Sequence, residues 1–280
     1  MADNRGDLGI GYGMHFRYRL LIFSLAMVCG CGVNAGTAGL SKDELAQSAK
    51  IDALTIPTAG ELFAALNKIG KPNWQQEYRK PIPTAFTSRP QIALNLGGLI
   101  ADGYVAVQAE DSQQVKNTGK DIVTLSKTFG VSENIMGRVK CISDFAENNE
   151  WSSLKEELEA TQNEVKQAMD ERHDKELVTL VTLGGWIRGT EVVSGWISEN
   201  YSPAAARLLR QPAIVAFLRG KLAELPQKEQ SDHLVQEVEV KLEAIEKLLS
   251  YPADKTPTLE EVKALNAAAV ELGREISTKQ

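Results

Sequence analysis

Three charged side chains occur inside two segments of the sequence that are otherwise apolar nearly all round. Asp102 interrupts residues 92–107, and Arg188 and Glu191 interrupt residues 177–197. Because an unpaired charge is costly to bury, we expect these groups to pair, Asp102 with Arg188 first of all. The alternative is a pocket in which the same charges and nearby aromatic rings bind a ligand. The residues of that candidate binding site are Asp102, Tyr104, Trp186, Arg188, Glu191 and Trp196.

Carboxylates in such a pocket could also act as the general acid and base of an enzyme, but the sequence carries no motif that identifies a reaction. It contains no Gly-x-Ser-x-Gly elbow, no paired-cysteine metal motif and no His-Glu-x-x-His run. Asp170, His173 and Asp174 could share a helical face, but the second acid-x-x-His run that a di-metal site needs is missing. The sequence therefore predicts no metal and no cofactor, and it favours a binding or structural role over catalysis.

The stretch LSKTFGVSENIMGRVK, residues 125–140, resembles the repressor-type helix-turn-helix. Ser126 takes the small-residue position, Gly130 sits at the turn, and Ser132 is expected to cap the second helix with Met136 and Val139 buried. The resemblance implies a sharp corner between two helices, and it makes a DNA-binding regulator one possible function.

DNA binding needs basic groups on the recognition helix. The exposed start of the second helix carries Glu133 and Asn134, and only Arg138 and Lys140 are positive further on. The chain as a whole is acidic, with 31 Lys and Arg against 37 Asp and Glu and a formal net charge of -6. We therefore expect a structural corner and no nucleic-acid partner.

The first part of the chain has the layout of an export signal. Residues 14–19 are cationic and are followed by nine apolar residues, 20–28, which as a helix would rise only about 13 Å. A membrane span needs roughly 20 residues. Residues 28–31, Val-Cys-Gly-Cys, resemble the lipobox of bacterial lipoproteins, which implies that Cys31 is acylated and that the protein's membrane partner is reached through this lipid anchor.

Two alternatives to the lipoprotein remain: cleavage after residues 33–35 (Val-Asn-Ala) with plain secretion, or a cytoplasmic protein whose start is misread, with Met1 or Met14 as the true start. The predicted location is the cell envelope, facing the periplasm. Removal of the leader leaves Cys141 as the lone thiol, and we expect it to be a small buried residue on the apolar side of its helix.

The remainder of the chain predicts an all-α fold of about ten helices. Ser or Thr followed three residues later by Glu marks four helix starts, at Ser41, Thr58, Ser153 and Thr258. Four prolines forbid a continuous helix over residues 71–90, which we expect to be a connector, with a lid as the alternative. The expected helices cover residues 41–54, 58–69, 89–110, 112–129, 132–148, 152–173, 175–200, 203–224, 228–250 and 258–276.

Two of these helices share a pattern, Leu-Gly-Gly-Leu-Ile at residues 96–100 and Leu-Gly-Gly-Trp-Ile at residues 183–187. A glycine inside a helix costs roughly 1 kcal/mol relative to alanine, so Gly97, Gly98, Gly184 and Gly185 should have a packing role. We predict that these helices are central, and that they pack against each other or play equivalent roles in two pseudo-repeated halves.

The expected organisation is a leader over residues 1–31, a tether with a first helix over residues 32–57, and a helical domain over residues 58–280. The predicted function is that of an exported, lipid-anchored binding or structural protein whose ligand or protein partner the sequence does not identify. An enzyme with a carboxylate site between the two glycine-bearing helices is the second possibility.

Overall fold

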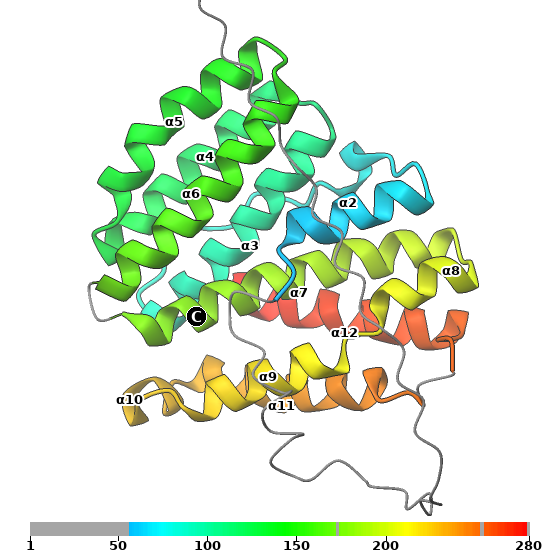
Figure 1. The fold of residues 1–280 in the computed structure, drawn as a ribbon. Coiled ribbons are helices and arrows are strands. Elements are labelled where there is room, and N and C mark those ends of the chain that lie inside the picture. The colour runs from blue at the N-terminus through cyan, green and yellow to red at the C-terminus, as the bar shows by residue number, and fades with distance from the viewer. Residues whose placement is uncertain (1–55, 172–173, 253–254, 279–280) are drawn as a thin grey trace, which may run out of the picture. The chain divides into compact units, whose positions relative to one another are not determined.

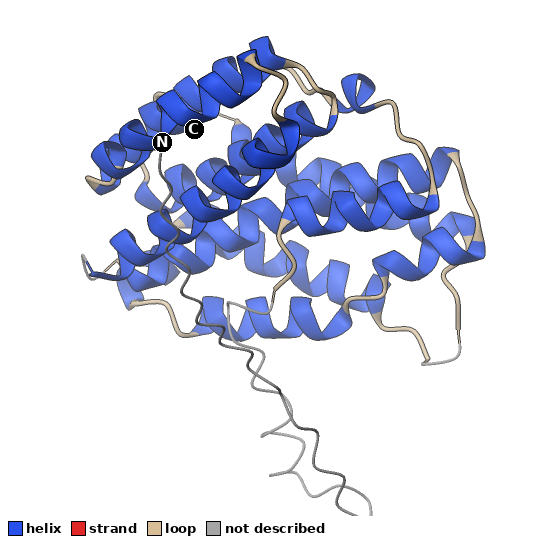
Figure 2. Ribbon diagram, turned by 45° about the horizontal axis from the view of Figure 1, so that its top comes forward, coloured by secondary structure: helices blue, strands red, loops and turns tan. Residues whose placement is uncertain are grey.

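The computed structural model describes residues 56–171, 174–252 and 255–278, and over these residues it is helical with no strand (Figures 1 and 2). The all-α fold class is therefore confirmed. The leader, the lipobox, most of the tether and the expected helix 41–54 lie outside the described residues. None of the helices that the structure describes is both long enough and apolar enough to span a membrane.

Among the described residues nine helices are longer than two turns, and short 3₁₀ or α-helical pieces connect several of them. The longer ones are α2 (Ala59–Ile69), α3 (Arg89–Gln108), α4 (Ser112–Ser126), α5 (Ser132–Glu147), α6 (Trp151–Glu171), α7 (Lys175–Glu199), α9 (Pro212–Ala223), α11 (His233–Leu249) and α12 (Leu259–Ser277). The short ones are η2 (Trp74–Glu77), η3 (Lys127–Phe129), α8 (Pro203–Ala206), η4 (Arg207–Leu209) and α10 (Gln227–Gln230).

Two of the predicted capping boxes are present and one is wrong. The Thr58 and Thr258 hydroxyls each accept a hydrogen bond from the backbone N–H of the Glu three residues on, and that Glu accepts one from the cap N–H. Ser153 does not cap a helix, because the chain turns at Asn149 (φ 57°) and α6 already begins at Trp151. The Ser41 box lies outside the described residues.

Each of two expected long helices is in fact divided. Residues 203–224 break before Pro212, which has no backbone N–H to donate and begins α9 instead. Residues 228–250 break at Asp232, whose carboxylate accepts hydrogen bonds from the N–H groups of Leu234 and Val235 and so caps α11.

Helices α3 to α6 form a ring in which each packs against the next and α6 packs back on α3 (Figure 1). Helix α7 joins this ring to the remaining helices through its contacts with α3, α6, α2, α9 and α12. Helix α11 packs between α9 and α12. The contact between α3 and α7 is the most extensive of all, and both helices are buried over most of their circumference.

Glycine allows the backbones of α3 and α7 to touch. A Cβ atom on Gly97 would lie 1.9 Å from the Val181 carbonyl oxygen, and one on Gly184 would lie 1.9 Å from the Leu94 carbonyl oxygen. The predicted packing of these two helices against each other is thus observed, whereas their equivalence in two pseudo-repeated halves stays a prediction. Gly185 differs from Gly97 and Gly184, because a Cβ at this position would lie 3.4 Å from the Gly97 oxygen, an ordinary van der Waals contact.

The corner between α4 and α5 has the predicted geometry but not all of the predicted burial. Gly130 adopts φ 67°, and Ser126 is fully buried. The N-cap of α5 is Val131 rather than Ser132. Met136 is 58% exposed, so its predicted burial is wrong.

Cys141 is exposed as well, against the prediction. The buried stripe of α5 is formed by Ile135, Ile142 and Ala146. At about 100° per residue, position 141 lies roughly 120° away from the centre of that stripe. Of the apolar residues on which the prediction rested, Ile135, Val139, Ile142 and Phe145, the one on the same side of the helix as Cys141 is Phe145, which is only partly buried.

We predict that Gly97→Ala and Gly184→Ala each lower the free energy of unfolding by about 3 kcal/mol or more, because the new methyl group meets backbone that cannot rotate away. Urea unfolding followed by tryptophan fluorescence measures this change. Gly185→Ala is the matched control from the same contact, and it should be neutral or stabilising by up to about 1 kcal/mol. An equal loss of unfolding free energy in all three variants would contradict the close backbone contact at Gly97 and Gly184.

Candidate functional site

The charges that interrupt the two apolar segments do meet in the folded chain. Arg188 Nε donates a hydrogen bond of 2.8 Å to Asp102 Oδ1, and Arg188 Nη1 lies 3.0 Å from Glu191 Oε1. The Arg188 side chain is 5% exposed and that of Asp102 is 14% exposed. The expected pair between α3 and α7 is therefore present, and it is largely withdrawn from water.

A second arginine completes this cluster, and the sequence analysis did not single it out. Arg79 Nε donates a hydrogen bond of 2.8 Å to Asp102 Oδ2, so the carboxylate is held between two guanidinium groups. Arg79 Nη2 lies over Gly98, at 3.0 Å from the position that a Cβ would take. Nη2 is buried and lies 2.7 Å from the same Asp102 oxygen, but it makes no aligned hydrogen bond. Gly98 thus makes room for a side chain rather than for a helix backbone.

The Arg188 side chain contacts residues of three elements, α3, η2 and its own helix α7. Its Nη2 donates to the backbone carbonyl of Glu77, at the end of η2, in addition to its contacts with α3 and with its own helix. Burial lowers the pKa of Arg188, but the facing carboxylates of Asp102 and Glu191 raise it by more, so the group stays charged. Burial also raises the pKa of the Glu77 carboxyl, only partly opposed by Arg188.

The first half of the irregular segment before α3 is fixed to the helices by contacts of Trp74, Tyr78 and Arg79. The Trp74 indole N–H donates to Asn67 Oδ1 (3.2 Å), and the ring packs on Phe63 with centroids 5.1 Å apart. The Tyr78 hydroxyl donates to Asp111 Oδ2 (3.2 Å), and burial together with this carboxylate raises the pKa of Tyr78. Together with the bond from Arg79 to Asp102, these contacts hold this part of the segment against the helices, as expected of a connector.

A polar cleft lies beside this cluster, between residues 78–82 and helices α3 and α4. The centre of a water-sized sphere can occupy ≈ 300 Å³ of it. Its charged lining residues are three cations, Arg79, Lys80 and Lys120, and two anions, Asp102 and Asp121, a formal sum of +1. Burial raises the pKa of Asp121. The cleft is therefore suited to a small polar ligand with a negative group.

The three aromatic residues of the predicted site do not line this cleft. The Tyr104 ring packs on Gly60 of α2, and its hydroxyl lies 3.4 Å from Gln162 Oε1. The Trp186 indole donates to Gln211 Oε1 (3.0 Å), and Trp196 lies against Gly70. The structure thus brings Asp102, Arg188 and Glu191 together and holds the rings elsewhere, with Tyr104 and Trp186 in the core and Trp196 partly buried against it.

The basic residue Arg138 of the helix-turn-helix-like corner makes its contacts within the fold. Arg138 of α5 bonds to Glu157 (2.7 Å) and also to Glu164, both on α6. These hydrogen bonds raise the pKa of Arg138. Its guanidinium is therefore occupied by carboxylates instead of facing outward toward a phosphate.

The other sequence candidates add no second polar site. Within residues 56–171, 174–252 and 255–278, no group of three or more His, Cys, Asp or Glu is placed to hold a metal ion. Asp174 occupies the N-cap position of α7 without a capping hydrogen bond from its side chain, and it pairs with Arg89 at 2.8 Å. Cys31, the expected acylation site, and His173 lie outside the described residues.

Comparison of the chain with protein-family models, with curated proteins and with solved structures gave no match.

We predict that Asp102→Asn lowers the free energy of unfolding by about 3 kcal/mol, because it leaves two inward-facing guanidinium groups without their shared carboxylate. Urea unfolding is the appropriate measurement, since guanidinium chloride would screen the charges. Glu191→Gln, at a 19% exposed carboxylate with one contact to Arg188, is the control and should cost about 1 kcal/mol. A loss for Glu191→Gln as large as that for Asp102→Asn would refute the central place of Asp102.

Proposed function

We propose that this protein is an exported, lipid-anchored binding protein of the cell envelope, and that it takes a small anionic ligand in the cleft beside Arg79. Ligand binding is proposed from the cleft itself, which is lined by three cations and two anions although the chain is acidic overall. A positively charged recess on an acidic molecule attracts anions selectively, because the rest of the surface disfavours them.

The geometry of the cleft supports binding by a preformed site. Its floor is built on α3 and α4, and its rim, Tyr78 to Ile82, is held by hydrogen bonds to Asp102 and Asp111. Little of the rim has to become ordered when a ligand binds, so less affinity is lost to conformational entropy. Lys80 and Lys120 are exposed, and they can reach toward a ligand without leaving a buried partner behind.

The second candidate, an enzyme with a carboxylate site, is less well supported. Both oxygens of Asp102 already accept hydrogen bonds of 2.8 Å from arginine Nε groups. A general base must present a free oxygen to the proton that it removes. The arrangement therefore favours a structural role for Asp102, with the neighbouring cations left to attract the ligand.

Export and anchoring rest on the leader alone, on the cationic stretch 14–19, the apolar run 20–28 and Cys31 in its lipobox-like setting. A single lipid-modified cysteine would tether the helical domain to the membrane surface, on the periplasmic side in this proposal. The partners proposed are thus the membrane, through the lipid, and a small anionic molecule, with no nucleic acid.

For the cleft, citrate and inorganic phosphate serve as probes, titrated by calorimetry at low ionic strength. Lys80→Ala combined with Lys120→Ala is expected to weaken the binding of citrate at least about tenfold, which corresponds to about 1.4 kcal/mol for two lost charges. The control combines Lys140→Ala with Lys228→Ala, which removes the same charge from exposed positions that do not line the cleft. Absence of saturable binding by either probe, or equal weakening in both double variants, would rule the cleft out as an anion site.

For the anchor, Cys31→Ala is expected to abolish incorporation of radiolabelled palmitate and to move the protein from the membrane to the soluble fraction. Globomycin, which blocks the lipoprotein signal peptidase, should cause the precursor of the unaltered protein to accumulate. Cys141→Ala is the control, because it removes the thiol that lies outside the leader and leaves Cys31 in place. An unprocessed, unlabelled native protein in the cytosol would refute export.

A further inference from the structure

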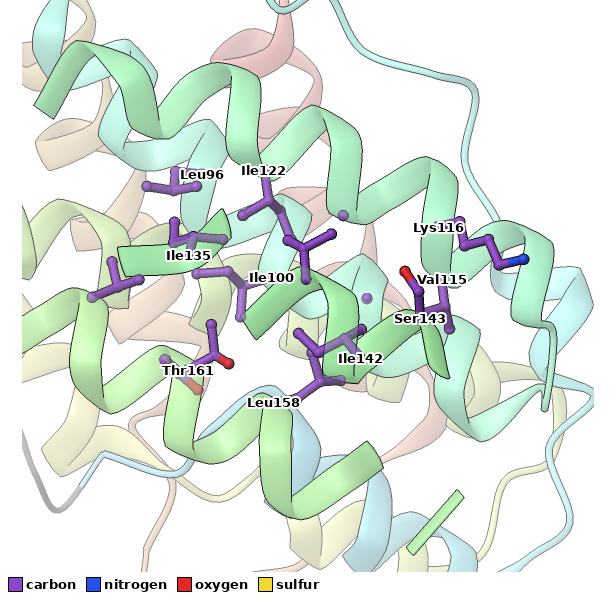
Figure 3. Close-up of a pocket in the computed structure, with 15 residues that line it drawn as sticks. Leu96, Ile100, Val115, Lys116, Ile122, Ile135, Ile142, Ser143, Leu158 and Thr161 are labelled. Atoms are coloured by element: carbon purple, nitrogen blue, oxygen red, sulfur yellow. The ribbon is translucent and has the colours of Figure 1, made fainter. Parts of the chain in front are cut away.

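A second cavity lies inside the ring of α3, α4, α5 and α6, and it differs from the cleft in being apolar (Figure 3). Its walls carry branched aliphatic side chains from all four helices, among them Ile100, Ile122, Ile142 and Leu158. The centre of a water-sized sphere can occupy ≈ 50 Å³ of it. This apolar slot is therefore narrow, and an alkyl chain would lie partly inside it and partly along its half-exposed walls, while a broad ring system would not enter.

The slot divides the core of the ring. The buried apolar side chains of the described residues fall into a main cluster and a smaller one. Ile135 and Val165 of the main cluster line the slot together with Val115 and Ile142 of the smaller one. Protein interiors are normally packed without such interruptions, and a continuous core would have closed over this space.

Two glycines border the slot, and neither is needed for close packing. A Cβ on Gly119 of α4 would meet none of the described atoms within 4 Å outside its own helix, and one on Gly103 of α3 would meet only a Thr118 methyl at 3.8 Å. Glycine inside a helix is less favourable than alanine. At Gly97 and Gly184 the close approach of α3 and α7 offsets that cost, but here the absent side chains instead leave the slot wide enough to be filled.

Water is a poor occupant of this space, because a buried water needs two to four polar partners. The wall hydroxyl of Thr161 donates to the Glu157 carbonyl (2.7 Å), and Gln162 Oε1 accepts from the Tyr104 hydroxyl. The other polar wall residues, Lys116 and Ser143, lie together at one end and leave the aliphatic part of the slot without partners for water. An alkyl chain needs no such partners and would bury the partly exposed faces of Ile100, Ile122 and Leu158.

One end of the slot carries a cation. Figure 3 shows Lys116 and Ser143 together at this end, with Leu96 and Ile135 toward the other. Lys116 Nζ pairs with Glu147 at 2.6 Å, but both side chains are well exposed, at 34% and 58%. An exposed pair of this kind contributes little to stability, so the ammonium group can turn to a competing carboxylate.

From these observations we infer that the slot binds a single-chain fatty carboxylate, with the alkyl chain among the aliphatic walls and the carboxylate at Lys116. The inference does not depend on the proposed anion cleft, which lies on the side of α4 that carries Lys120 and Asp121.

The test is calorimetric titration of the full chain with dodecanoate below its aggregation concentration, with dodecanol as the uncharged analogue. Gly119→Leu fills the slot and is expected to weaken dodecanoate binding at least about tenfold without lowering the melting temperature. Gly137→Leu is the matched control on α5, where a Cβ likewise meets no described neighbour but where the residue does not line the slot. It should bind as the unaltered protein does.

Lys116→Met tests the polar end, and it should weaken dodecanoate severalfold while leaving dodecanol unchanged. If Gly119→Leu fails to fold, Gly119→Ala takes its place, with a smaller but measurable loss of affinity and a raised melting temperature. No saturable binding of dodecanoate, or undiminished binding by a folded Gly119 variant, would overturn the slot as a ligand site. Binding to phosphatidylglycerol vesicles but not to free dodecanoate, or equal effects of Lys116→Met on both probes, would overturn the choice of a fatty carboxylate.

Discussion

The close approach of α3 and α7 is the constraint on which the rest of the described fold depends. The Gly97 and Gly184 positions lie against the carbonyl groups of Val181 and Leu94, at a spacing that admits no side chain. The two helices cross at these glycines, and the Asp102–Arg188 pair follows the crossing on the C-terminal side of both helices. The two helices therefore run in the same sense. The chain between them reverses at each junction, from α3 through α4, α5 and α6 to α7, and four reversals return it to the first direction. The three helices α4 to α6 can therefore complete the ring with α3 before α7 begins.

The charge cluster is a consequence of the same contact. Because the backbones of α3 and α7 touch, the side chains of Asp102 and Arg188 are largely withdrawn from water. Pairing the two charges costs less free energy than burying each of them alone. Arg188 then has donors left over, and it uses one on the Glu77 carbonyl. The connector before α3 is held in this way, and Arg79 reaches the second oxygen of Asp102 over the gap left by Gly98. A helix contact thus fixes an irregular segment, and that segment supplies one wall of the cleft.

Local signals in the sequence predicted local structure well, and they failed where the outcome depended on distant partners. Thr58 and Thr258 cap their helices because the cap and its Glu are three residues apart and need nothing else. Ser153 carries the same pattern but lies within α6, since the turn at Asn149 starts that helix early. The pairing of Asp102 with Arg188 could be expected from burial alone, whereas Arg79 comes from a segment without periodicity and could not be assigned a partner. Cys141 and Met136 show that apolar neighbours in the sequence do not identify the buried face of a helix unless the angular spacing is counted.

The glycines separate two physical situations that look alike in the sequence. Each of Gly97, Gly184, Gly103 and Gly119 lies inside a helix, where it gives up stability relative to alanine. At the first two, the surroundings are so close that a methyl group would strike backbone, so the stability is recovered by packing two buried helices. At Gly119 the surroundings are open and apolar, and nothing within the described residues recovers the loss. Gly137 has equally open surroundings but lies off the slot, so the open surroundings alone do not indicate a ligand. Gly119 differs because it lines an apolar space that the surrounding side chains leave unfilled, where an alkyl chain would make the contacts that the glycine does not.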